Sequence, residues 1–151
     1  MKYSEEVAKK LNALLEKNYD SEKGYLLAAE KVKDQDLKFF FNQRAKERYD
    51  FGHELKDEIR KFREAPDPGT SLKSDIFRGW MNIRSLVSSD NEAAFLKEVL
   101  RGEIEALNEY NEILEDRTIP PSTGNILMRQ RNSIAAALKK VESFQESKLK
   151  L

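Results

Sequence analysis

Side chains that carry oxygen ligands interrupt the apolar stripe near the middle of four predicted helices. They are Glu22, Glu47, Glu103 and Gln130. Carboxylates that point inward from several helices of a bundle are the ligands of di-metal centres, where they hold ions such as iron or manganese. These residue types and spacings can therefore support the binding of a divalent metal. Reaction of the bound metal with dioxygen would be a further step.

A second ligand is expected three residues after two of these side chains, because residues three apart share one face of a helix. Those positions hold Asp50 and Ser133. Metal-binding bundles place a histidine there, in a Glu-x-x-His pattern. The candidate metal site is thus an incomplete set without imidazole, made of Glu22, Glu47, Asp50, Glu103 and Gln130.

The same positions support a second interpretation that needs no metal. Arg44 and Arg48 flank Glu47, and the stripe of the second predicted helix, taken through positions 40, 44, 47 and 51, places Arg44 and Glu47 inward. Arginines, Gln130 and tyrosines can neutralise buried carboxylates in a hydrogen-bonded network. Weak binding of Mn, Fe, Mg or Ca remains the alternative, and we expect no catalytic residues because both imidazoles are missing.

The composition excludes several other kinds of site. The 151 residues contain no Cys and one His, which removes disulfides, thiolate metal sites and multi-histidine sites. That histidine, His53, lies about 200° round the helix from Phe51 and is expected to face solvent. Lys plus Arg equals Asp plus Glu, at 27 each, and no basic stripe is present, so we expect neither a nucleic-acid nor a membrane partner. The first residues carry no secretory pattern, which predicts a cytoplasmic protein.

Four long helical patterns and one short pattern must position these residues. Apolar residues recur every three or four positions over 4–33, 37–62, 89–113 and 122–147, and a shorter stripe covers 72–87. The short polar break 34–36 and the break 119–121 each predict an antiparallel hairpin. We therefore predict one all-α domain over 1–151: a ferritin-like four-helix bundle of two antiparallel hairpins with an extra short helix in the long crossover connection.

Three motifs occur in order along the chain: Asp20-Ser21-Glu22-Lys23-Gly24-Tyr25, Arg78-Gly79-Trp80-Met81 and Arg101-Gly102-Glu103. Together with the Asp36-Leu37-Lys38 and Glu47-Arg48 segments, they resemble a small bacterial ferritin-like four-helix-bundle family of unknown function. The resemblance spans nearly the whole chain, and it implies the ferritin-like fold, a helix in the crossover and no established activity. Asp50 and Ser133 depart from the Glu-x-x-His motifs of classical ferritins and rubrerythrins, which argues against iron oxidation.

The expected function is a non-catalytic bundle that self-associates into a homo-oligomer, with no assured cofactor. A di-metal oxidase or iron-handling protein, with Fe or Mn, is the first alternative. The second is a protein-interaction module that uses the crossover helix around Gly79 and Trp80. The run Phe39-Phe40-Phe41 covers more than one helix face, so at least one ring should point away from the core, either under the crossover helix or in a self-association surface.

Overall fold

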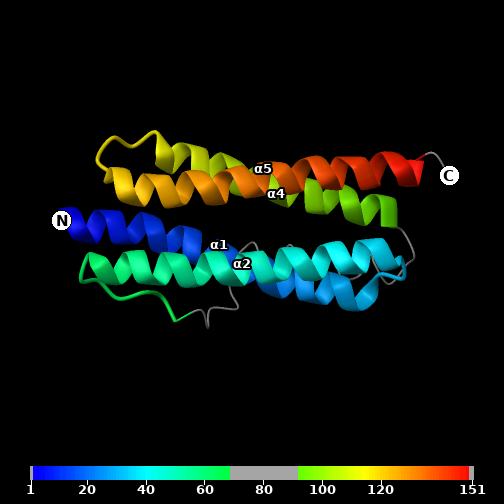
Figure 1. Cartoon of the computed structure of the whole chain (residues 1–151), viewed down its shortest axis with the longest axis horizontal. Helices are drawn as coiled ribbons and strands as arrows, with labels where there is room; N and C mark the ends of the chain where they lie inside the picture. The colour runs from blue at the N-terminus through cyan, green and yellow to red at the C-terminus, as the bar shows by residue number, and fades with distance from the viewer. Residues whose placement is uncertain (1, 69–91, 150–151) are drawn as a thin grey trace.

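Four long α-helices make up most of the structure, a computed structural model that describes residues 2–68 and 92–149. They are α1 (Tyr3–Lys31), α2 (Gln35–Lys61), α4 (Glu92–Leu114) and α5 (Pro121–Leu149) (Figure 1). The described ranges contain no strand, which agrees with the predicted all-α class. The short helix predicted over 72–87, with Gly79 and Trp80, lies outside the described residues.

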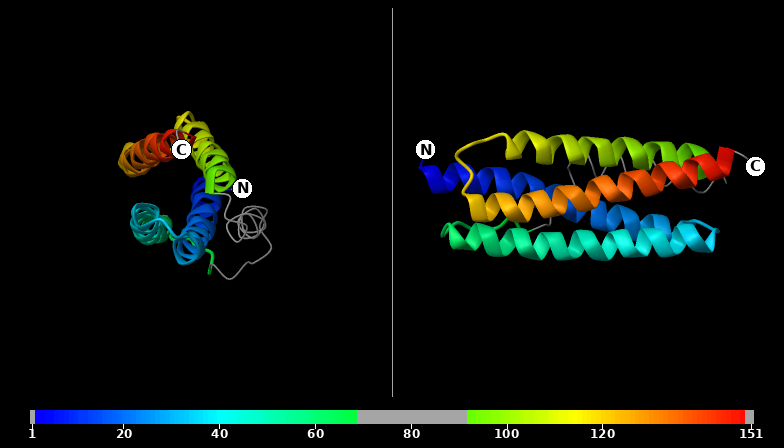
Figure 2. Two further views of the ribbon diagram at one scale, coloured as in Figure 1. Left: turned by 90° about the vertical axis from the view of Figure 1, so that its right-hand side faces the viewer. Right: turned by 45° about the horizontal axis from the view of Figure 1, so that its top comes forward.

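The helices form two antiparallel hairpins, as predicted. Helix α1 packs against α2, and α4 packs against α5. The two hairpins meet where α1 contacts α4 and where α2 contacts α5, so that the four helices surround a shared interior (Figure 2). None of the helices in the described ranges is long and apolar enough to span a membrane.

Local sequence explains how the first hairpin turns. The side chain of Asp34 accepts hydrogen bonds from the backbone N–H groups of Asp36 and Leu37, at 2.9 and 3.1 Å, and so caps the first turn of α2. An aspartate at this position satisfies helix donors that have no partner within the helix. Three residues between Lys31 and Gln35 therefore suffice to reverse the chain.

Helix α2 ends in a tight backbone turn. Arg63 has a φ of 59°, in the left-handed region. The N–H of Glu64 bonds to the carbonyl of Ile59, and the N–H of Arg63 bonds to that of Arg60. These two bonds form a Schellman motif, in which glycine is the usual residue at the left-handed position.

The core consists of two apolar clusters with polar side chains between them. One cluster, near the turn between α1 and α2, contains Tyr25, Phe41 and Phe95, whose rings pack with centroids 5.3 to 5.8 Å apart. The other contains Leu11, Leu55 and further aliphatic side chains toward the opposite end of the bundle. The polar side chains between these clusters define the candidate site.

Candidate functional site

Five buried polar side chains meet near the middle of the bundle, and every described helix contributes at least one. They are Asn18 from α1, Arg48 from α2, Glu103 and Tyr110 from α4, and Gln130 from α5. None of these residues is more than 3% exposed. Buried polar groups are costly unless they are hydrogen-bonded, so their partners decide what this cluster does.

An ion pair lies at one end of the cluster. The Arg48 Nη2 atom donates to Glu103 Oε1 at 2.7 Å, and Nη1 donates to Asn18 Oδ1 at 3.0 Å. One guanidinium thus joins α2 to both α4 and α1. Burial by itself lowers the pKa of Arg48, but the Glu103 carboxylate and the neighbouring phenols outweigh burial and raise that pKa above its usual value. Arg48 is therefore a permanent cation inside the bundle.

Hydrogen bonds extend from this pair to α5. Asn18 Nδ2 donates to the carbonyl of Leu14 at 2.8 Å and to the Tyr110 hydroxyl at 3.0 Å. The Tyr110 hydroxyl donates to Gln130 Oε1 at 2.6 Å, and Gln130 Nε2 approaches the carbonyl of Phe51 at 3.4 Å. The chain of bonds from Glu103 to Gln130 therefore crosses all four described helices and fixes the two hairpins relative to each other.

Two phenols in and beside this network are held in the neutral form. Burial is the largest cause that raises the pKa of Tyr110 to about 12. Burial also raises the pKa of Tyr25 well above its usual value, and the negative charge of Glu103 adds to that effect. Neither phenol can supply a tyrosinate near neutral pH, so both act as hydrogen-bonding or packing groups there.

The predicted metal ligands are not brought together. Glu103 and Gln130 are buried in the network, but Glu47 is half-buried and pairs with Arg44, and Asp50 is exposed. Glu22 is half-buried, and burial raises its pKa, while the charges of Lys23, His53 and Lys56 act in the opposite direction. Within the described ranges, no group of three His, Asp or Glu side chains is placed to hold a metal ion.

The prediction that Arg44 and Glu47 face inward was wrong by one position. Phe40 and Phe41 are both buried, so the stripe of α2 can be started from either ring. Starting from Phe41 gives positions 41, 45, 48, 52 and 55, all of which are buried, and this phase brings Arg48 inward. His53 is exposed, as predicted. The hydrogen-bonded network that we predicted among the inward polar residues includes Arg48, Glu103 and Gln130, whereas Glu22 and Glu47, which were expected in it as well, are not bonded within it.

A second buried carboxylate links the hairpins at the other end of the bundle. Glu58 Oε1 accepts a hydrogen bond from the Thr123 hydroxyl at 2.9 Å, and Oε2 accepts one from Lys61 Nζ at 2.7 Å. The side chain of Glu58 is only 3% exposed. The contact between Glu58 and Thr123 joins the end of α2 to the start of α5, and its two partners account for both carboxylate oxygens.

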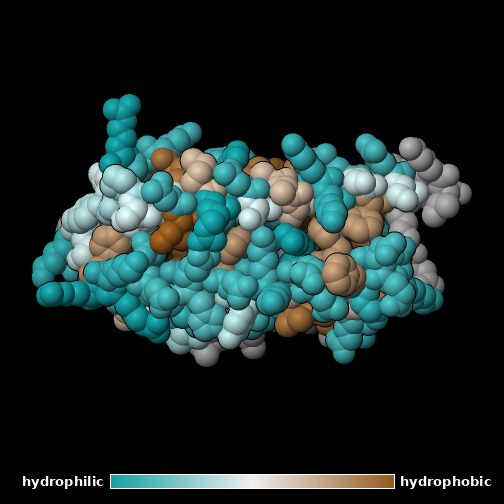
Figure 3. All heavy atoms as spheres, in the orientation of Figure 1, coloured by the Kyte–Doolittle hydropathy of each residue, from teal (hydrophilic) through white to brown (hydrophobic). Residues whose placement is uncertain are grey.

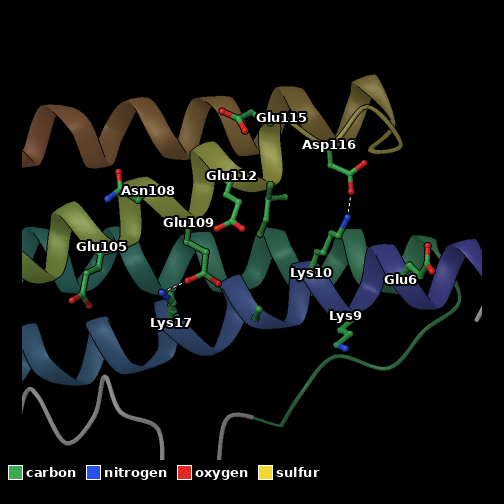
Figure 4. Close-up of a pocket in the computed structure, with 12 residues that line it drawn as sticks. Glu6, Lys9, Lys10, Lys17, Glu105, Asn108, Glu109, Glu112, Glu115 and Asp116 are labelled. Carbon is green, nitrogen blue, oxygen red and sulfur yellow. Dashed lines mark ion pairs between the residues drawn. The ribbon is translucent and has the colours of Figure 1, made fainter.

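The groove between α1 and α4 is lined with charges of both signs (Figure 4). Ion pairs cross it from Lys10 to Asp116 and from Lys17 to Glu109. Lysines of α1 face carboxylates on the opposite side of the groove. We therefore interpret the groove as a solvent-exposed contact between the two hairpins. These two ion pairs add electrostatic attraction between the hairpins.

Comparison with known proteins places the chain in a family. Residues 6–116 match the family described as a domain of unknown function, DUF2383. The matched range contains Asn18, Arg48, Glu103 and Tyr110, and so most of the central network, but not Gln130. No curated protein matches the chain. Because the match covers well over half of the residues, the chain belongs to the DUF2383 family.

Proposed function

We propose that this chain is a non-enzymatic, self-associating bundle of the ferritin-like class, in which an internal guanidinium takes the place of metal ions. The observation that carries the proposal is the fully buried Arg48, bonded to Glu103 and Asn18. In metal-dependent bundles, a cation neutralises the inward carboxylates. Here the side chain of Arg48 supplies that positive charge.

The connectivity supports the ferritin-like class. Two antiparallel hairpins are joined by one long connection, between the end of α2 at Lys61 and the start of α4 at Glu92. Bundles with a single long crossover of this kind include the ferritin-like folds, whereas up-down-up-down bundles have only short loops. The proposed class therefore rests on topology and on the central position of the polar residues.

Electrostatics disfavours a metal beside Arg48. A divalent ion bound to the Glu103 carboxylate would lie a few ångströms from the guanidinium. Two unit charges about 4 Å apart interact by about 4 kcal/mol at an effective dielectric constant of about 20, and a divalent ion would double that repulsion. The donor set around Glu103 therefore fits an arginine better than a metal.

One observation favours the di-metal alternative. Glu103 Oε2 is buried and accepts no hydrogen bond of standard geometry, although the Tyr25 phenol interacts with this carboxylate, so Oε2 is the atom most available to a metal. For Glu47 or Asp50 to join it, α2 would have to rotate and withdraw Arg48 from the core. An oxidase or iron-handling function thus requires a rearrangement of α2.

Elemental analysis tests the choice between the two functions. The protein is loaded anaerobically with Fe(II) and Mn(II), desalted and analysed, with the wild type beside Glu22→Ala and Glu103→Ala. We expect no stoichiometric metal in any of the three proteins. Retention of about one to two ions per wild-type chain, lost in Glu103→Ala, would instead support the di-metal function and make oxygen consumption the next assay.

A further inference from the structure

An exposed aromatic ring stands at the start of α2. Phe40 is 5% exposed and Phe41 is fully buried, but Phe39 is 67% exposed. This outcome confirms the prediction that one ring of the three points away from the core. A phenylalanine exposed to this extent leaves most of its apolar surface in water, which favours contact with another apolar surface.

A surface groove of about 520 Å³ lies beside this ring, between the start of α2 and the end of α5. Its apolar part consists of Phe39, Phe40 and Phe144, and the last two rings pack with centroids 5.3 Å apart. The charged side chains of its lining are Asp36 and Arg44 from α2 and Lys140 from α5, and Arg44 is already paired with Glu47. Figure 3 shows hydrophobic atoms exposed in the crease between α2 and α5 and at other places on this mainly hydrophilic face.

We propose that a second copy of this chain docks on this face with two-fold symmetry, so that Phe39 of each copy enters the groove of the other. The inference deepens the proposed self-association by naming its surface. A two-fold contact requires one patch to carry both a projecting group and a cavity that receives it. Phe39 and the adjacent groove meet this requirement on a single face.

Charge complementarity favours a second copy over another kind of partner. Neither Asp36 nor Lys140 forms an ion pair with another described residue, and across a two-fold axis each Asp36 meets the Lys140 of the other copy. A nucleic acid or an acidic protein would need an edge of uniform positive charge, which Asp36 does not allow. Two copies of a chain with a formal net charge of zero also do not repel each other over long distances.

Sedimentation equilibrium over micromolar to millimolar concentrations tests the surface. We expect a dimer whose dissociation constant rises tenfold or more in Phe39→Ala, because a central aromatic anchor is removed. Leu26→Ala is the matched control, since Leu26 lies on α1 and is 49% exposed, and it should leave dimerisation unchanged. Alanine is a good helix former, and unchanged unfolding midpoints will show that both variants fold.

A mixing experiment tests the symmetry. Asp36→Lys and Lys140→Asp should each weaken dimerisation, because each variant places like charges against each other twice. An equimolar mixture of the two should dimerise about as strongly as the wild type, since every contact in the mixed dimer again pairs opposite charges. A mixture no stronger than its components would overturn the two-fold arrangement.

The outcomes separate this surface from the function on which it rests. A wild-type dimer that is insensitive to Phe39→Ala overturns the proposed surface but leaves self-association intact. A wild-type protein that stays monomeric at all concentrations overturns self-association itself. Retained metal in the elemental analysis bears on the centre of the bundle and not on this face.

Discussion

Replacement of Arg48 by methionine should cost more stability than any other single change at the centre of the bundle. The Arg48 side chain is 1% exposed and that of Glu103 is 4% exposed, so neither charge can be solvated by water. Removing one partner of such a pair leaves a buried carboxylate without its cation, which costs about 3 to 5 kcal/mol. A domain of ordinary stability has only about 5 to 15 kcal/mol in total, so Arg48→Met should be marginally stable.

The double variant separates the cost of a broken pair from the value of the pair. Replacing both members of a buried ion pair by apolar residues of similar size is often neutral or stabilising. We therefore expect Arg48→Met/Glu103→Met to lie within about 2 kcal/mol of the wild type, well above Arg48→Met alone. In a double-mutant cycle, this recovery corresponds to a coupling of at least about 2 kcal/mol.

Urea unfolding followed by far-UV circular dichroism gives these free energies. Arg44→Met is the matched control, because Arg44 lies one turn earlier on α2, is 21% exposed and pairs with Glu47 within the same helix. It should cost at most about 1 kcal/mol. A loss of less than about 1 kcal/mol in Arg48→Met, or additive losses in the double variant, would refute the argument that the pair is buried and coupled.

Three further predictions concern the rest of the structure. Alkaline pH should unfold the protein. The pKa of Tyr110 is raised to about 12 in the folded state, so the stability that its neutral phenol contributes is fully present below the unfolded pKa of about 10 and is lost as the pH rises toward 12. Burial also raises the pKa of Tyr25, so the stability that its neutral phenol contributes is likewise lost as the pH rises. Tyrosinate absorbance of both phenols should therefore appear together with the loss of helix, and earlier ionisation in the folded protein would contradict their burial. Arg63→Gly should raise the unfolding free energy by about 0.5 to 1 kcal/mol in urea, because glycine adopts a φ of 59° without strain; a loss would argue against the Schellman turn. Thr123→Val should cost about 1 to 3 kcal/mol in the same assay, because Glu58 Oε1 loses its partner in the interior, whereas Thr118→Val, in the exposed loop before α5, should cost less.

The fold followed from the sequence because apolar spacing and turn chemistry agree in each segment. The stripe predicted over 4–33 corresponds to α1 at Tyr3–Lys31, and that over 122–147 corresponds to α5 at Pro121–Leu149. Asp34 both interrupts the pattern and caps the next helix. Short breaks between long helices leave an antiparallel hairpin as the only compact arrangement.

The site followed from the sequence only in part. Glu103 and Gln130 were placed inward and are buried. Glu22 was placed inward as well, but it is half-buried, because the buried face of α1 passes from Asn18 to Tyr25 through Ser21 and not through Glu22. Arg48 could not be placed by spacing, since the adjacent rings of Phe40 and Phe41 allow two phases of α2.

Pairing is the part that spacing cannot supply. Helix period places Glu103 on an inward face, but it does not say whether a metal ion or a guanidinium meets the carboxylate there. The answer depends on the register between α2 and α4, which brings Arg48 Nη2 within 2.7 Å of Glu103 Oε1. Two helices far apart in the sequence must pack before that contact exists.

The most direct test of the central claim is thermal unfolding of the wild type in EDTA and in excess Fe(II) or Mn(II) under anaerobic conditions. If Arg48 already supplies the positive charge, the unfolding temperature should be the same in all three solutions. A metal present at about a hundred times its dissociation constant would add about 2.7 kcal/mol and raise the unfolding temperature of a domain of this size by about 5 to 10 °C. A rise of that size, abolished in Glu103→Gln, would show that a metal and not Arg48 completes the centre of the bundle.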